Sequence, residues 1–168
     1  MRRIFQKIIE VGIVTEPLIY DEHFAALGAQ LRTAIDRRFG NSLAIRQVDA
    51  GSCNACELEI HALNNPYYDI ERFGVHFVAS PRHADVLLVT GPVSRHMEEA
   101  LRRTYAAMAE PKWVIAAGTC ACDGGEFGCT YASVGAVEKV LPVDLKIAGC
   151  PPNPMQLMQG VLALMQKK

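Results

Sequence analysis

The sequence lacks several features that would assign it to a common class of protein. No run of residues approaches the roughly 20 apolar residues of a membrane span, so we expect no transmembrane helix. The 17 Lys and Arg side chains against 18 Asp and Glu side chains leave a net charge of −1, which disfavours a dedicated nucleic-acid-binding protein. Neither G-x-G-x-x-G nor a P-loop follows any predicted strand, which disfavours a nucleotide-binding site.

The N-terminus also lacks the pattern of a secretory signal peptide. Arg2 and Arg3 precede only a broken apolar stretch, residues 4–14, and no small-residue cleavage site follows it. We therefore expect a cytoplasmic protein, in which thiols stay reduced and cysteines serve metal binding or catalysis more often than disulfides. The six cysteines among the 168 residues thus become the main clue to function.

Hydrophobic periodicity predicts strands that alternate with helices. Helices are predicted over residues 21–40, over residues 94–111, and from Pro154 to about Gln166. Five short aliphatic segments are predicted to be strands, namely residues 42–48, 75–79, 84–90, 112–117 and 144–149. The third and fourth of these are apolar almost throughout, which is typical of parallel strands covered on both faces. The sequence therefore predicts a doubly wound α/β fold of the flavodoxin-like kind, with helices on both faces of a parallel sheet.

The chain is expected to divide into an N-terminal segment and a larger α/β domain. Residues 1–41 form the expected helical segment for docking to a partner or membrane subunit, and residues 42–168 form the domain that carries the site. Near the N-terminus, Ile4, Ile8 and Val11 share one side of a helix that also carries basic residues. Such a helix either docks on a membrane subunit or anionic lipid surface, or packs across the α/β domain.

Four cysteines follow predicted strands at the edge where parallel sheets bind ligands. Cys53 and Cys56 follow the first strand, Cys120 follows the fourth, and Cys150 follows the fifth. Because carboxyl ends of parallel strands meet at one edge, we expect four thiols from three loops to gather there. A glycine stands one or two residues before each loop's first cysteine and permits close backbone approach: Gly51, Gly118 and Gly149.

The residues leave two candidates for the group bound at this edge of the sheet. Four cysteines satisfy either a tetrahedral structural zinc ion or a 4Fe-4S cluster. Structural zinc sites usually combine two short C-x-x-C-like pairs and stabilise small domains, whereas this chain has one pair, two distant cysteines and enough residues for an ample core. The pattern favours an iron-sulfur cluster, and zinc is the alternative. A catalytic cysteine is disfavoured because no His lies near the thiols in a recognisable motif.

Several motifs resemble the iron-sulfur small subunit shared by nickel-iron hydrogenases and respiratory complex I. They are residues 72–93 (RFGVHFVASPRHADVLLVTGPV), residues 117–125 (AGTCACDGG) and residues 141–154 (LPVDLKIAGCPPNP). The resemblance covers about residues 43–166. It implies that the four cysteines bind one 4Fe-4S cluster, the one closest to the active site of the partner subunit. The implied ligands are Cys53, Cys56, Cys120 and Cys150.

The spacing of the first two cysteines distinguishes two branches of that family. The complex I subunit places these two ligands in adjacent positions, whereas hydrogenase small subunits use C-x-x-C, as in this chain. The stretches YDIERFG and SPRHADVLL resemble the group 4, membrane-associated energy-converting hydrogenases, such as the small subunits of formate hydrogenlyase. The alternative is a complex I-like quinone oxidoreductase subunit, or a subunit of a hydrogenase-related complex that lacks nickel.

The resemblance implies an oxidoreductase subunit without a complete active site of its own. Hydrogen chemistry would take place on a nickel-iron large subunit, and the cluster near it would transfer electrons. A ferredoxin-like subunit with two 4Fe-4S clusters and integral membrane subunits are the other expected partners. The chain would then lie peripherally on the cytoplasmic face of the cell membrane, held there through these partners.

Two glutamates and two further cysteines also lie near the predicted site in the sequence. Glu59 stands where the family has an acidic residue near the cluster, and we expect it to relay protons if partial burial raises its pKa. Glu57 is interpreted as a first-turn helix acid favoured by the helix dipole. Cys122 and Cys129 occupy positions where the family is not expected to have thiols. We interpret both as small buried hydrophobic residues, with ligation or redox sensitivity as the alternative.

Overall fold

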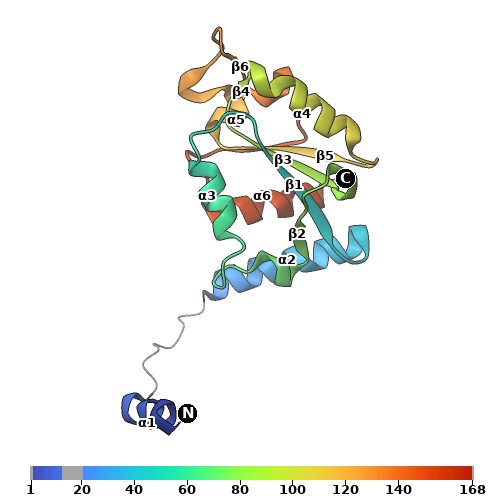
Figure 1. Cartoon of the computed structure of the whole chain (residues 1–168). Helices are drawn as coiled ribbons and strands as arrows, with labels where there is room; N and C mark the ends of the chain where they lie inside the picture. The colour runs from blue at the N-terminus through green and yellow to red at the C-terminus, as the bar shows by residue number, and fades with distance from the viewer. Residues whose placement is uncertain (1, 13–20, 168) are drawn as a thin grey trace.

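The computed structural model describes residues 2–12 and 21–167, and it shows a parallel sheet between layers of helices (Figure 1). The five strands of the sheet lie in the order β2-β1-β3-β5-β7, and all neighbours are parallel. Their bounds are β1 (Leu43–Asp49), β2 (Val75–Phe77), β3 (Val86–Thr90), β5 (Trp113–Ala117) and β7 (Leu145–Ile147). A separate antiparallel pair consists of β4 (Val93–Ser94) and β6 (Ser133–Gly135).

This strand order identifies the fold class. When β4 and β6 are left out, the order reads 2-1-3-4-5 along the chain, which is the flavodoxin-like order. The predicted fold class is therefore confirmed, and each of the five predicted strands is present. The order reverses between β1 and β3, and ligands bind open α/β sheets at the carboxyl ends of strands beside such a point.

Helices cover both faces of the sheet. Figure 1 shows α2 and α6 on one face and α4 and α5 on the other. The helices are α1 (Arg2–Val11), α2 (Glu22–Phe39), α3 (Ala55–Ala62), α4 (Arg95–Ala107), α5 (Thr119–Asp123) and α6 (Pro154–Gln166). Short 3-10 turns are η1 (Ile70–Phe73), η2 (Pro81–His83), η3 (Gly125–Phe127) and η4 (Val137–Lys139). The three predicted helices correspond to α2, α4 and α6.

Local sequence signals explain where the two long helices that share a face begin and end. The Asp21 side chain accepts hydrogen bonds from the backbone N–H groups of His23 and Phe24, so it caps the start of α2. Gly40 ends α2 in the left-handed conformation, with φ of +75°. Asn153 and Gln156 form a reciprocal capping box at the start of α6, just after the loop that carries Cys150.

Alternation along the strands divides the core into two halves. Val86 and Leu88 of β3 pack in the half formed with α2 and α6, whereas Leu87 and Val89 pack with α4 and α5. The strand is therefore buried on both faces, as its apolar run predicts. On the first face, α2 packs against α6 and buries Phe24, Leu27, Leu31 and Ile35. The helix that ends the expected N-terminal segment thus contributes to the core of the α/β domain.

Helix α1 differs from the other helices in leaving its apolar side exposed. Each of its large apolar side chains is more than half exposed: Ile4, Phe5, Ile8, Ile9 and Val11. These side chains therefore do not pack across the α/β domain, and docking of residues 1–41 to a partner stays a prediction. Residues 13 and 14, at the end of the predicted apolar segment, lie outside the described residues. Within residues 2–12 and 21–167, no helix is long and apolar enough to cross a membrane.

Candidate metal centre

Three loops at the carboxyl end of the sheet carry the four predicted ligands. Cys53 precedes α3 and Cys56 lies in its first turn, both after β1, while Cys120 lies in the first turn of α5, after β5. Cys150 lies between β7 and α6. All four thiols are free; Cys53 and Cys150 are exposed, and Cys56 and Cys120 are half-buried. The four thiols thus lie on one rim that is open to solvent.

A close approach at Gly118 brings the first and second of these loops into contact. A Cβ atom added to Gly118 would lie 2.6 Å from Sγ of Cys56, a separation that real side chains do not tolerate. The φ of Gly118 is +92°, a conformation that favours glycine. The glycine therefore leaves the space that the Cys56 thiol occupies, immediately beside the loop that carries Cys120.

Hydrogen bonds join the second loop to the third. The Thr119 backbone N–H donates to the Gly149 carbonyl at 2.8 Å, and the Thr119 hydroxyl lies 3.1 Å from the same oxygen. Because Thr119 precedes Cys120 and Gly149 precedes Cys150, these contacts hold the two cysteines in neighbouring turns of the chain. Folding has therefore gathered thiols that are far apart in the sequence.

The thiols also lie within electrostatic range of one another. Burial, followed by the charges of Glu57, Cys53, Cys120 and Cys150, raises the pKa of the Cys56 thiol to about 12. Burial raises the pKa of Cys120 as well, with further contributions from Cys150 and Cys53. Packing four ionisable thiols together is unfavourable for their charged forms, and a bound cationic group would reverse this effect because it stabilises thiolates.

A hydrogen-bonded network supports the loop that presents Cys53 and Cys56. Oδ1 of Asp49 accepts hydrogen bonds from the N–H groups of Gly51 and Ser52, each at 2.8 Å. The Ser52 hydroxyl donates to Oε2 of Glu57 at 2.6 Å and accepts from the N–H of Asn54 at 3.1 Å. The turn before α3 is therefore held at several points by the side chains on either side of it.

The carboxylate that the fold buries here is Glu57. Its side chain is 6% exposed, and its Oε1 has no hydrogen-bond partner among the residues that the structure describes. Glu59 is half-buried, and its role as a proton relay stays a prediction. Glu57 lies in the first turn of α3, as interpreted from the sequence, but its burial was not predicted. Helical spacing was the available signal, because Glu57 lies three residues before the buried Ile60.

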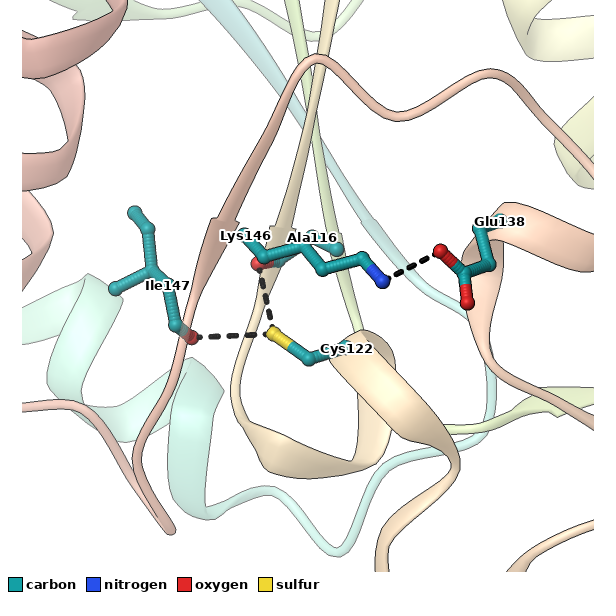
Figure 2. A network of polar contacts seen from close by, with 5 residues as sticks. All are labelled: Ala116, Cys122, Glu138, Lys146 and Ile147. Carbon is teal, nitrogen blue, oxygen red and sulfur yellow. Dashed lines mark hydrogen bonds and ion pairs between the residues drawn. The ribbon is translucent and has the colours of Figure 1, made fainter.

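The two remaining cysteines have different environments. Cys122 is buried, and its thiol donates to the carbonyl oxygens of Ala116 and Ile147, both at 3.5 Å (Figure 2). Burial raises the pKa of this thiol, and the nearby Lys146, which is paired with Glu138, opposes that rise. The prediction of a small buried residue is therefore confirmed for Cys122.

The same prediction is wrong for Cys129, which is exposed. Cys129 follows η3 in a loop outside the core, where the neighbouring Phe127 and Tyr131 are 58% and 95% exposed. The loop has little regular structure to bury it, so a small apolar side chain there remains in contact with solvent.

Whether the residues present could hold a metal group depends on the donor set and the space. No three Cys, His, Asp or Glu side chains within the described part of the chain are arranged to hold a metal ion. The four rim thiols are nevertheless all free, share one edge, and include Cys56 in the space left by Gly118. Four thiolates are the donor set of a 4Fe-4S cluster, and in this respect the residues fit such a group.

Comparison with protein families places the fold and the rim in context. Residues 53–164, more than half of the chain, match the family described as NADH ubiquinone oxidoreductase, 20 Kd subunit. The chain belongs to this family. The matched region begins at the first rim cysteine and includes the other three, so all four lie within the part that the family shares.

Related proteins of the family come from bacteria and archaea. The chain is 41% identical over 155 residues to formate hydrogenlyase subunit 7 of Escherichia coli, covering 90% of this chain and 59% of that protein. It is 43% identical over 128 residues to the probable membrane-bound hydrogenase subunit mbhJ of Pyrococcus furiosus, covering 76% and 77% of the two chains. An uncharacterized protein of Methanocaldococcus jannaschii is 46% identical over 126 residues, covering 75% and 84%. The chain thus spans less than two thirds of the formate hydrogenlyase subunit.

A solved structure has the same fold. It is that of the membrane-bound sulfane sulfur reductase, an archaeal respiratory membrane complex, one chain of which superimposes with a TM-score of 0.67. The sequences are 34% identical, and the match covers 81% of this chain and 74% of that one. The predicted resemblance to hydrogenase small subunits and complex I subunits is therefore confirmed.

Proposed function

We propose that this protein is the electron-transfer subunit of a membrane-associated, energy-converting hydrogenase complex. The single observation that carries the proposal is the gathering of four free thiols from three loops at one rim of the sheet. In this proposal Cys53, Cys56, Cys120 and Cys150 are the ligands of one 4Fe-4S cluster. The cluster lies next to the nickel-iron site of a large partner subunit. Membership of the family and the hydrogenase relatives support this assignment.

The residues around the rim have distinct tasks in this proposal. A bound cluster supplies a one-electron redox centre, whose potential depends on hydrogen bonds and burial. Gly118 leaves space for the Cys56 thiol, while Thr119 and Gly149 keep the Cys120 and Cys150 loops together. The network of Asp49, Ser52 and Glu57 holds the turn that presents the first two thiols.

Partner subunits would cover the exposed side of the rim. Leu58, two residues after Cys56, is 63% exposed, and Phe127 and Tyr131 are exposed in the loop that follows α5. Exposed large apolar side chains beside a functional rim are typical of a surface that another protein covers. In this proposal the large subunit covers it and performs the hydrogen chemistry, so this chain has no complete active site. A ferredoxin-like subunit exchanges electrons with it, and membrane subunits anchor the complex on the cytoplasmic side.

A second candidate is a complex whose large subunit has other chemistry. Two observations support this candidate. One chain of a sulfane sulfur reductase has a similar structure, and the family's name refers to the reduction of a quinone. The rim would then hold the same cluster, but electrons would go to a different acceptor. The sequence of the large partner distinguishes the two, because two C-x-x-C pairs are expected in a nickel-iron subunit and not in the alternative.

Cysteine replacement tests the ligand assignment directly. After anaerobic purification, wild-type protein is expected to contain about four iron and four sulfide per chain, with no stoichiometric zinc. Replacement of Cys53, Cys56, Cys120 or Cys150 with Ser is expected to remove most of this iron and the low-temperature electron paramagnetic resonance signal of the reduced protein. Cys122→Ala and Cys129→Ala are the matched controls and should keep both. Stoichiometric zinc, or full iron content in any of the four ligand variants, would contradict the assignment.

A further inference from the structure

A small cavity lies at the edge of the sheet beside α3. Its volume is about 350 Å³, and Arg46 and Gln47 of β1 form one wall. Strand β2 pairs with β1 only from Leu43 to Ile45, so β2 ends just before these two residues. Two other segments form the remaining walls. One is the end of α3 and the turn after it, with Ile60, His61 and Asn64, and the other is the end of β2 and the two residues after it, with Phe77, Val78 and Ala79.

The cavity is lined by a half-buried arginine, Arg46, that has no charged partner among the described residues. Nε of Arg46 is buried, and it has no hydrogen-bond partner in the part of the chain that the structure describes. Within residues 2–12 and 21–167, Arg46 also forms none of the ion pairs. Holding a charged side chain partly out of water without an acceptor is unfavourable, so an acceptor from outside the chain that reaches the exposed part of the guanidinium would stabilise it.

The chemistry of the walls indicates which acceptor fits. Arg46 is the only permanent cation in the lining, and no Asp or Glu contributes to it. A single negative charge therefore balances the site. Ile60 and Phe77 provide an apolar surface beside the polar Gln47, His61 and Asn64, as expected for a carboxyl group on a short apolar stem. The planar guanidinium matches a carboxylate in geometry, because it can donate two parallel hydrogen bonds.

We propose that this cavity binds a carboxylate group, with the guanidinium group of Arg46 as the principal donor. The proposal concerns a site separate from the rim and does not depend on the cluster. The two sites share α3, which presents Cys56 near its start and Ile60 and His61 near its end. The carboxylate can belong to a free organic acid or to an acidic side chain of a partner subunit, and the experiment below distinguishes these sources.

Nuclear magnetic resonance of the full chain tests the carboxylate site. Acetate is the probe, and acetamide is its neutral counterpart of similar shape. Acetate is expected to shift the Arg46 Nε–H resonance saturably, whereas acetamide should leave it unchanged. Arg46→Gln should weaken acetate binding, followed on the His61 and Asn64 resonances, at least about tenfold, because it removes a charge-assisted hydrogen bond. Arg37→Gln, on the exposed side of α2, is the matched control and should bind acetate as the wild type does.

Any one of three results would overturn the proposal. These are no saturable shift in the folded wild type, an equal response to acetamide, or unchanged acetate binding in Arg46→Gln. The wild-type measurement requires no substitution, so it remains decisive even if Arg46→Gln fails to fold. Arg46→Lys then provides a second variant, which keeps the charge but loses the planar fork, and it should bind acetate more weakly than the wild type.

Modification of arginine by phenylglyoxal, followed by mass spectrometry, separates the two sources. In the isolated chain, acetate should protect Arg46 from the reagent. If the assembled complex protects Arg46 without added acetate, a partner's carboxylate occupies the cavity. If Arg46 in the complex still reacts and acetate still protects it, the natural ligand is a free organic acid. Reaction in the complex without any protection by acetate would refute the site.

Discussion

The two ends of the parallel sheet differ in how their polar groups are satisfied. At the amino end, Asp144 accepts a hydrogen bond from the Val114 N–H at 2.7 Å, and its own N–H donates to the Val114 carbonyl. Asp85 forms the same reciprocal pair with Ala44. At the carboxyl end, four thiols are free and Oε1 of Glu57 is buried without a partner among the described residues.

At the amino end of the sheet, groups of the same chain also satisfy the carbonyl oxygens at a helix end. Arg38, in the last turn of α2, donates to the carbonyl oxygens of Leu164 and Lys167 at 3.0 Å, which satisfies the end of α6. Its guanidinium also lies 4.5 Å from the centre of the Trp113 ring at the start of β5. One end of the sheet is thus complete within the chain, while the other presents groups that another molecule can satisfy. We expect the first end to determine stability and the second to determine function.

The largest effect is expected from an added methyl group at the carboxyl end. Gly118→Ala should destabilise the fold by about 3 kcal/mol, because the new Cβ would collide with Sγ of Cys56 and alanine disfavours the positive φ. If the rim holds the proposed cluster, the substitution should also remove most of its iron. Gly28→Ala is the matched control, since its Cβ would meet the Phe73 ring in the core, far along the chain from any rim cysteine. Urea unfolding and iron analysis should show lost stability in both variants but lost iron only in Gly118→Ala.

Substitutions at the amino end of the sheet should change the stability of the protein without changing its iron content. Asp144→Ala removes a charged acceptor from the N–H of the buried Val114, which is expected to cost about 2 kcal/mol of unfolding free energy. Iron content should not change. Asp36→Ala removes only an exposed ion pair with Arg32 and should stay within about 0.5 kcal/mol of the wild type. If Asp144→Ala lost iron while keeping its stability, the proposed division between the two ends would be incorrect.

A smaller effect is expected in the turn that presents the first two thiols. Ser52→Ala removes the donor to Oε2 of Glu57 and should destabilise the protein by about 1 to 2 kcal/mol. Because the network orients the turn, the reduction potential of the proposed cluster should also shift, as measured by redox titration. Ser80→Ala, which removes a long cap at η2, is the control. An unchanged potential in Ser52→Ala would show that the network supports the fold without tuning the site.

The smallest effect concerns how the stability of the chain without the proposed cluster depends on pH. In the unfolded chain Cys56 ionises near its ordinary pKa of 9.0, whereas in the folded chain its pKa is raised to about 12. The folded state therefore holds this proton more tightly, and stability should fall as pH rises above 9 towards 12. The decrease by pH 10 should be less than about 1 kcal/mol, because the half-exposed thiol is partly screened by solvent. Cys56→Ser should flatten this dependence in urea unfolding between pH 8 and pH 10, and an equal slope would contradict the assigned cause.

Local pattern was sufficient to predict most of the fold. The apolar runs became β3 and β5, and the amphipathic spacing in residues 21–40 became α2 with its cap at Asp21 and its end at Gly40. These elements follow from propensity and periodicity, which a few adjacent residues specify. The short pair β4 and β6 was not predicted, since two- and three-residue strands depend on contacts between Val93 and Gly135, which are distant in the sequence.

The candidate site was predictable in part. The positions of the rim cysteines after strands indicated that they would gather, because topology brings the carboxyl ends of parallel strands together. The burial of Glu57, the exposure of Cys129 and the unpartnered Nε of Arg46 were not foreseen. Helical spacing from Ile60 was a local signal for Glu57. The environments of Cys129 and Arg46 depend on which side chains from other segments pack against them, and no local pattern encodes that.

The sequence by itself determined the alternation of strands and helices, the helix ends and the placing of a cysteine after three strands, since each depends on residues close together in the chain. Tertiary structure decided that the Cys56 thiol lies against Gly118, that the Cys120 and Cys150 loops are joined, and that one edge of β1 is left open at Arg46. Those features arise from contacts between segments tens of residues apart, and only the packing of the complete sheet and its helices fixes such distances.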